Sequence, residues 1–232
     1  MPVVAESIIK ITGGNFPAGL PAKASRTISE GGVMIHPTAT IHGYGCRFDR
    51  EEPVERIRCY KGRDSGKPMI VLIPSVCWLD RLCDDIPEQA RTLADKFWPG
   101  GLTLILQASR EFRGMCCWPS GTVALRHCAH PFTSAVLDEL EMPLVSTSLG
   151  HSGEPVPQDS IEFTRNLYVH SNISKIRPPE LAVIDTELEG VYRKPSTLVD
   201  LSVPGTVRML RAGAVARGAI EQAIGCELEK DI

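Results

Sequence analysis

Short apolar runs alternate with helical patterns along most of the chain, and this alternation limits the possible folds most strongly. The runs MIVLI at 69–73 and LTLILQ at 102–107 are apolar at nearly every position. Such runs are typical of strands that are buried on both faces because helices cover the sheet. Between the strands, segments such as 132–141 carry apolar residues at helical spacing. The pattern predicts an α/β fold.

The predicted elements follow from this periodicity and from the glycines and prolines that bound it. Helices are expected at 21–30, 51–61, 87–97, 132–141, 159–168 and 214–225. Strands are expected at 33–36, 69–73, 102–107, 122–126, 144–148, 181–185, 196–201 and 206–210. There is no internal repeat and no long linker. We therefore expect one domain with an open, twisted, mixed sheet and helices packed on it.

The net charge, the length of the apolar runs and the first residues of the chain limit which partners and which cellular location we expect. A formal net charge of −3 gives no global attraction to nucleic acid or membrane, so any site for anions must be local. No apolar run approaches the roughly 20 residues of a membrane span. The first residues lack the basic and apolar regions of a signal peptide. We expect a cytoplasmic protein that has no contact with a membrane.

The eight cysteines include no C-x-x-C pair, and Cys116 and Cys117 are adjacent. In a cytoplasmic protein such cysteines are expected to be reduced and mostly buried. His127 and His130 have the spacing of a metal pair, but no second cluster of ligands accompanies them. A catalytic thiol and a zinc site are therefore the less favoured alternatives, and we expect no metal bound by the protein itself.

A cluster of cations closes the predicted helix 51–61 and leads into the predicted strand 69–73. Lys61, Arg63 and Lys67 occur within the sequence KGRDSGK. Connections between rigid elements of α/β folds often carry binding sites. Arginine and lysine together suit a polyanion such as a nucleoside triphosphate. The alternative is a solvated basic loop.

Small hydroxyl residues and further cations lie at the ends of the predicted strands. Each of them alone has a simpler explanation as a turn, a cap or a surface residue. Together they provide several hydroxyl groups and cations that one sheet would bring to a common cleft. They are Thr38, Thr40, Thr122, Arg126, Ser146, Thr147, Ser148, Ser196, Thr197 and Arg211.

Seven blocks of sequence resemble the YrdC-like threonylcarbamoyl-AMP synthase family, and they occur in the family order. The blocks are PTATIHGYGC, YKGRDSGKP, FWPGGLTLIL, TVALRHCAHP, STSLGHSG, STLVDL and MLRAG. The resemblance covers about residues 23–215. It implies an N-terminal segment at 1–22, one YrdC-like domain and a C-terminal helix and tail at 216–232. The implied fold is an open α/β structure with a large concave cavity lined by cations.

The resemblance also implies a reaction and a set of site residues. The family joins L-threonine, bicarbonate and ATP, with Mg²⁺, into threonylcarbamoyl-AMP and pyrophosphate. The product is used for N6-threonylcarbamoyladenosine at position 37 of tRNA, so tRNA and tRNA-modifying proteins are implied partners. The implied roles are threonine binding for Thr40, Arg126, Ser146 and Ser196, ATP binding for Arg63, Lys67, Thr122, Ser148 and Arg211, and catalysis for Lys61, Arg63 and Ser148.

The chain departs from the family pattern at several positions of the implied site. The family has an acid, a Tyr, a Leu, an Asn and a Ser where this chain has Ala39, His42, Tyr44, Gly150 and Val156, and a Gly-Pro where it has Gly100-Gly101. If the family reaction is retained, we expect another polar group or water to replace the missing Asn contacts, with His42 and His151 as the two candidate side chains. Two alternatives remain: carbamoyl chemistry on another substrate, and a binding module for nucleotides or RNA that uses the cationic cavity.

Overall fold

The computed structural model describes residues 8–62, 69–113, 121–174, 176–189 and 194–229. Within these residues, the strands are β1 (Ile8–Ile11), β2 (Met34–Pro37), β3 (His42–Arg47), β4 (Ile70–Ile73), β5 (Leu102–Gln107), β6 (Thr122–His127), β7 (Leu144–Ser148), β8 (Leu181–Asp185), β9 (Thr197–Asp200) and β10 (Arg208–Arg211). The helices are α1 (Leu20–Ser29), α2 (Glu51–Lys61), α3 (Trp78–Leu82), α4 (Glu88–Phe97), α5 (Pro131–Leu140), α6 (Ser160–Ser174), α7 (Arg217–Ile224) and the 3₁₀ helix η1 (Thr186–Leu188).

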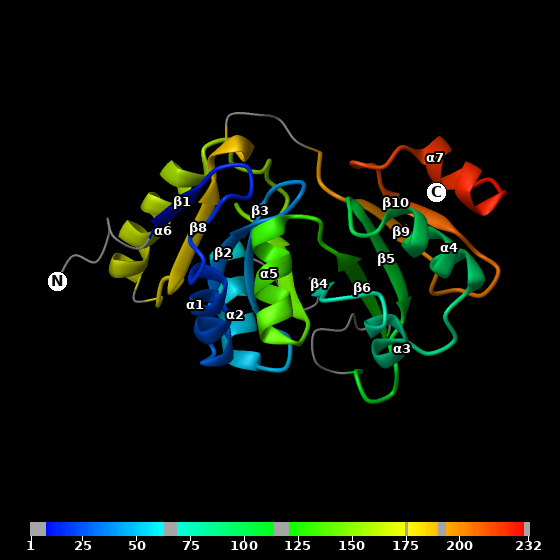
Figure 1. Cartoon of the computed structure of the whole chain (residues 1–232), viewed down its shortest axis with the longest axis horizontal. Helices are drawn as coiled ribbons and strands as arrows, with labels where there is room; N and C mark the ends of the chain where they lie inside the picture. Colours follow the sequence, from blue (N-terminus) through cyan, green and yellow to red (C-terminus); the bar gives the residue numbers. More distant parts are fainter. Residues whose placement is uncertain (1–7, 63–68, 114–120, 175, 190–193, 230–232) are drawn as a thin grey trace.

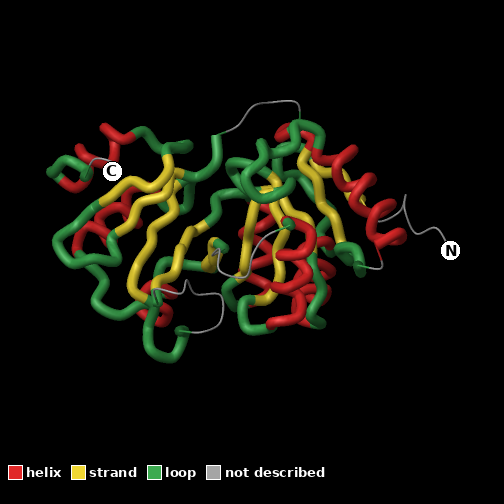
Figure 2. The backbone as a smooth tube through the Cα atoms, turned by 180° about the vertical axis from the view of Figure 1, so that it is seen from behind, coloured by secondary structure: helices red, strands yellow, loops and turns green. Residues whose placement is uncertain are grey.

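The described strands form one ten-stranded sheet in the order β1-β8-β2-β3-β7-β4-β6-β5-β9-β10. Four neighbouring pairs are parallel, namely β1/β8, β2/β8, β4/β6 and β5/β9. The other neighbouring pairs are antiparallel. Figure 2 shows the strands following one another across the molecule. The predicted α/β fold with a mixed sheet is confirmed.

Apolar side chains are buried on both faces of the sheet because successive residues of a strand point to opposite sides. In β4, Val71 and Ile73 belong to one buried cluster and Leu72 belongs to the other. The cluster around Leu72 includes residues of α1 and α5, which lie side by side in Figure 1. The cluster around Val71 includes residues of α2, α3, α4 and α7. The apolar run 69–73 is therefore explained by helices on both sides.

Most predicted elements are confirmed to within two or three residues, and the differences have local causes. Pro87 has extended backbone angles and precedes α4 as its N-cap, so the helix begins one residue later than predicted. The last helix begins at Arg217, three residues after the predicted start at 214. Helix α6 continues to Ser174, beyond the predicted end at 168. Its buried Ser171 lies within this added part, which packs on the protein.

The described cysteines divide into two groups. Cys46, Cys83 and Cys128 are buried, whereas Cys59, Cys77 and Cys226 are exposed, and all six are free thiols. The expectation of mostly buried cysteines is therefore confirmed for half of them, and Cys116 and Cys117 lie outside the described residues. None of the helices in the described ranges has the length and apolar character needed to cross a membrane.

Candidate active site

A cavity of about 440 Å³ lies over the middle of the sheet. Its floor comes from β3, β7, β4 and β6, and its walls come from the ends of α2 and β10 and from the segments 151–156 and 195–198. The strands that form the floor are direct neighbours in the sheet. The cavity therefore collects residues that are far apart in the sequence, as the polar strand ends predicted.

Small residues on one face of the central strands create the space for this cavity. Gly43, Ala124 and Ser146 line it. On the opposite face of the same strands, Val145 and Leu125 are fully buried in the apolar core. The alternation of residues along each strand thus places the core on one side and a hollow on the other.

Lys61 and Ser148 meet at one end of the cavity. The Lys61 Nζ atom donates hydrogen bonds to the Ser148 backbone oxygen at 2.7 Å and to its hydroxyl at 3.3 Å. Lys61 is the last residue of α2, which ends at Gly62 in a left-handed conformation. Lys61 therefore ends the helix, as the predicted range 51–61 implies. Arg63 and Lys67 lie outside the described residues.

Arg126 is buried at the floor of the cavity, and one of its nitrogens has no partner within the described part of the chain. Its Nε atom donates to the Gly100 backbone oxygen at 2.7 Å, and Nη1 donates to the Thr40 hydroxyl at 2.9 Å. Among the described residues, Nη2 has no hydrogen-bond partner and no carboxylate forms an ion pair with this side chain. Burial lowers the pKa of Arg126, but a guanidinium remains charged at neutral pH.

Ser196 and Arg211 contact one another at the opposite wall. Arg211 Nε donates to the Ser196 backbone oxygen at 3.1 Å, and Nη2 donates to the Ser196 hydroxyl at 3.0 Å. The Thr103 hydroxyl donates to the same oxygen at 2.8 Å. Burial lowers the pKa of Arg211, and the positive charge of Arg126 lowers it further. The structure thus joins a residue assigned to ATP with one assigned to threonine.

Thr122 has a different position from the other predicted site residues. It begins β6, and it shares one face of that strand with Ala124 and Arg126 because the strand period is two. Ala124 and Arg126 line the cavity, whereas Thr122 is not among the residues that line it. Its assignment to ATP remains a prediction.

His42 lines the cavity, but the network behind it uses both of its ring nitrogens. Its Nδ1 atom lies 2.9 Å from the Ser160 hydroxyl, and Nε2 accepts a hydrogen bond of 3.0 Å from the Asp185 backbone N–H. Burial lowers the pKa of His42 to about 4, so its ring is neutral at physiological pH. The expectation that His42 replaces the family Asn is wrong because neither nitrogen is available.

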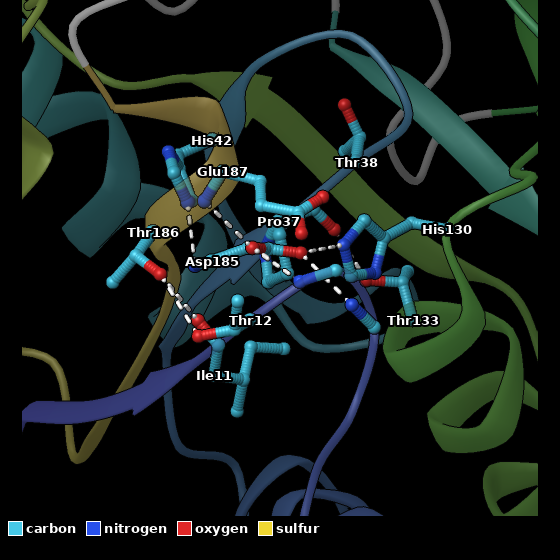
Figure 3. A network of polar contacts seen from close by, with 12 residues as sticks. Ile11, Thr12, Pro37, Thr38, His42, His130, Thr133, Asp185, Thr186 and Glu187 are labelled. Carbon is cyan, nitrogen blue, oxygen red and sulfur yellow. Dashed lines mark hydrogen bonds and ion pairs between the residues drawn. The ribbon is translucent and has the colours of Figure 1, made fainter.

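Asp185 lies at the centre of the network behind His42 (Figure 3). Its carboxylate accepts hydrogen bonds from the backbone N–H groups of Gly13 and Gly14 at 3.1 and 3.2 Å and lies 2.9 Å from His130 Nε2. Burial alone would raise the pKa of Asp185, but these hydrogen bonds and one from Glu187 lower it. The carboxylate therefore fastens the segment after β1 to the end of β8.

The departures at 150 and 156 have different surroundings. Gly150 has a φ of +86°, and a Cβ atom there would lie 3.0 Å from Pro157 Cδ. It is not among the cavity-lining residues, whereas Val156 and His151 are. An Asn at 150 would therefore need a shift of Pro157. His151 is the remaining candidate for a polar contact because it lines the cavity.

Sequence reasoning missed His36, which lies beside the cavity on the same face of the sheet as Ser146. It is fully buried, and its ring nitrogens lie 3.2 Å from the Thr133 hydroxyl and 3.1 Å from the Ser146 hydroxyl. The sequence feature that could have indicated His36 was its position in a predicted strand, directly before Pro37. A single residue of a strand does not indicate which neighbouring strand its side chain reaches.

Comparisons with known proteins agree with the fold. The Sua5/YciO/YrdC family model, described as "Telomere recombination", matches residues 26–213. The threonylcarbamoyl-AMP synthase of Pyrococcus abyssi is 34% identical over 87% of this chain, which spans 56% of that relative. The synthase of Marinobacter nauticus is 32% identical over 78% of this chain and 90% of the relative.

A solved structure supports the same relationship. The crystal structure of P. abyssi Sua5 complexed with L-threonine superposes with a TM-score of 0.81 at 30% identity and covers 96% of this chain and 62% of that one. The chain thus spans little more than half the length of several of its relatives. The match to the family model over most of the domain shows that the chain belongs to the Sua5/YciO/YrdC family.

Proposed function

We propose that this chain forms L-threonylcarbamoyl-AMP and pyrophosphate from L-threonine, bicarbonate and ATP. Relatives that carry the name threonylcarbamoyl-AMP synthase support the proposal, as does a relative whose crystal structure contains L-threonine. The single observation that carries it for this chain is the buried Nη2 atom of Arg126, which has no hydrogen-bond partner among the residues that the structure describes.

A buried guanidinium without a carboxylate partner favours an anionic ligand. Removing an ion from water costs several kcal/mol unless an opposite charge or hydrogen bonds compensate. Two nitrogens of Arg126 already donate hydrogen bonds to Gly100 and Thr40. Among the described residues, Nη2 is the nitrogen that lacks an acceptor. The α-carboxylate of an amino acid has the charge and size to accept this hydrogen bond. Ser196, which lines the same cavity, is a second donor for it.

The ATP part of the site is assigned to the end of the cavity that contains Lys61 and Ser148. Lys61 is held in place by Ser148, and Arg63 and Lys67 follow it in the sequence. Arg211 adds a further cation to the lining. Cations fixed in this way stabilise the charge that develops on phosphoryl oxygens and on the leaving pyrophosphate.

The residues described here do not form a magnesium site of their own. Glu154 is the one carboxylate in the described lining, and its side chain is 66% exposed. Mg²⁺ prefers several oxygen ligands and usually reaches such sites with substrate phosphates. We therefore treat MgATP as the substrate and assign no protein ligand to the metal.

The proposed reaction balances without a covalent enzyme intermediate. The amine of threonine attacks the carbon of bicarbonate, which gives a carbamate and water; attack on CO2 gives the same carbamate and releases a proton. A carbamate oxygen then attacks the α-phosphorus of ATP, and the bond to pyrophosphate breaks. The contribution of the protein is to hold two anions close together, which positioned cations make possible.

The test is pyrophosphate release by the purified chain with each substrate omitted in turn. The proposal predicts release only when MgATP, L-threonine and bicarbonate are all present. Equal release with another amine would favour a paralogue with a different substrate. Binding of nucleotide or RNA without any release would favour the binding module. The control is the Arg126→Met variant, which keeps the apolar stem of the side chain and removes the charge.

The downstream partners are proposed from the same family relationship. The product would supply the threonylcarbamoyl group for N6-threonylcarbamoyladenosine in tRNA, and this step requires further proteins. A cytoplasmic location and direct binding of RNA remain predictions.

A further inference from the structure

His36 connects two hydroxyl groups that come from different elements. It lies on β2, Thr133 lies on α5 and Ser146 lies on β7. The sheet order places β3 between β2 and β7, so the ring of His36 reaches over a whole strand to contact Ser146. The Nε2 atom lies 3.1 Å from the Ser146 hydroxyl.

Two glycines of β3 leave the path that this contact requires. A Cβ atom at Gly45 would lie 3.0 Å from His36 Cδ2 and 3.1 Å from Nε2. A Cβ atom at Gly43 would lie 3.3 Å from the Ser146 hydroxyl. All three of these distances are shorter than ordinary van der Waals contacts. The sequence HGYG in β3 therefore permits the ring and the hydroxyl to meet over the strand.

The positions of the protons in the series Thr133–His36–Ser146 follow from the hydrogen bond that the Thr133 hydroxyl donates. The Thr133 hydroxyl donates its single proton to the Pro37 backbone oxygen. Toward His36 it is left with acceptor lone pairs only, so Nδ1 must be the donor in that contact. A neutral imidazole carries one proton, which makes Nε2 an acceptor. The Ser146 hydroxyl must therefore donate to Nε2.

His36 stays neutral, as this order of protons requires. The pKa of His36 is lowered to about 3, mainly by burial. A hydrogen bond to the Pro37 backbone raises the pKa, whereas the charges of His130, His42 and Arg126 lower it. The ring therefore carries a single proton at physiological pH.

Two of the serines that line the cavity, Ser146 and Ser196, consequently have opposite hydrogen-bonding character. The Ser146 hydroxyl donates its hydrogen bond to His36 and therefore presents only lone pairs to the cavity. Ser196 accepts hydrogen bonds from Thr103 and Arg211, so its own proton remains available to a ligand. One hydroxyl is an acceptor and the other is a donor.

We infer that His36 is a positioning residue that fixes Ser146 as an acceptor, so that this part of the cavity takes the N–H donors of an amino group. The identity of the ligand as an amino acid rests on the proposed function. The direction of the His36–Ser146 hydrogen bond does not.

The tautomer of His36 is tested without any substrate. Long-range ¹H–¹⁵N spectra of the chain labelled at histidine report which ring nitrogen is protonated, and the His36→Gln variant assigns the signals. The expected result is a protonated Nδ1 and an unprotonated Nε2 from pH 5 to 8. A protonated Nε2, or titration within this range, would overturn the inference.

The effect on selectivity is measured with a matched pair of ligands. L-threonine and (R)-3-hydroxybutanoate differ by the amino group, and calorimetry gives the ratio of their affinities. In the His36→Leu variant, where the Ser146 proton is released, we expect the ratio to fall by about tenfold, as for a hydrogen bond to a charged group. The His36→Gln variant, whose amide oxygen is also an acceptor, should keep most of the ratio.

A further variant separates this role from a structural one. Gly45→Ala leaves His36 and Ser146 unchanged but displaces the ring, so the ratio should fall as in His36→Leu. A purely structural role would weaken both ligands equally and leave the ratio unchanged, which would contradict the inference. If the parent chain binds neither ligand, the proposed function fails, and the tautomer alone decides the role of His36.

Discussion

The Nζ atom of Lys61 lies 2.7 Å from the Ser148 backbone oxygen and 3.3 Å from the Ser148 hydroxyl, across a sequence separation of 87 residues. This contact joins the C-terminal end of α2 to the C-terminal end of β7. It places a buried cation and a hydroxyl group at the end of the cavity that we assign to ATP.

Replacement of this cation is expected to remove most of the activity. Lys61→Met keeps the length of the side chain but cannot stabilise charge on phosphoryl oxygens. Loss of one such electrostatic contact is expected to reduce kcat by about 10²–10³-fold. The measurement is pyrophosphate release with all substrates saturating. Lys23→Met on the exposed face of α1 is the control, and turnover within threefold of the parent in Lys61→Met would place the site elsewhere.

Arg126→Met should separate binding from stability. The variant loses the donor for the ligand carboxylate, so the affinity for L-threonine should fall by about 10–100-fold. The free protein should be as stable as the parent or more stable, because an uncompensated buried charge is removed. Thermal unfolding with and without L-threonine measures both effects. A large loss of stability in the absence of ligand would mean that Arg126 is structural.

Gly150 and Gly205 offer a matched pair for the effect of packing at positive φ. Their φ angles are +86° and +78°, but a Cβ atom would lie 3.0 Å from Pro157 at Gly150 and would contact nothing within 4 Å at Gly205. Alanine at either position pays for the left-handed backbone, roughly 1–2 kcal/mol. Gly150→Ala should cost about 1 kcal/mol more because of overpacking.

Chemical denaturation of the two glycine variants measures this difference. Equal free energies of unfolding would show that Pro157 moves freely. For the same reason, Gly150→Asn is expected to lose stability without a gain in threonine-dependent turnover.

The buried histidines predict a loss of stability on acidification. Burial lowers the pKa of His36 to about 3 and that of His42 to about 4. The unfolded chain, with a histidine pKa of about 6.5, therefore binds protons that the folded chain does not bind. The contribution of these histidines to the free energy of unfolding should be fully present above pH 6.5 and should decrease as the pH falls toward 4.

Variants at two histidines test the origin of this slope. His42→Gln keeps an acceptor for the Asp185 backbone N–H and should reduce the pH dependence between 6.5 and 4 by up to one proton. The control is His170→Gln at an exposed position, which should leave the slope close to that of the parent. An unchanged slope in His42→Gln would contradict the assignment.

Periodicity in the sequence was sufficient for the fold class but not for every strand. The apolar runs that form β4, β5 and β6 are strong signals because both of their faces are buried. Strand β3 was missed since His42, Gly43 and Gly45 interrupt any apolar pattern. Its neighbours β2 and β7 stabilise it through backbone hydrogen bonds on both sides, and such long-range pairing leaves no local trace.

Several residues of the candidate cavity were predictable from the sequence, but their contacts were not. The family resemblance supplied Lys61, Arg126 and Ser146, and each lies in the cavity. The polarity of the hydroxyl groups was not predictable, because it depends on His36 and Thr133, which approach from other elements. A sequence shows that a serine is present, whereas its partners determine whether it donates or accepts.

The most direct measurement is mass spectrometry of the nucleotide products formed by the purified chain with ¹³C-bicarbonate, L-threonine and MgATP. The proposed function predicts threonylcarbamoyl-AMP that carries the label, together with an equal amount of pyrophosphate. Unlabelled AMP as the sole product, or no nucleotide product at all from the folded chain, would contradict it.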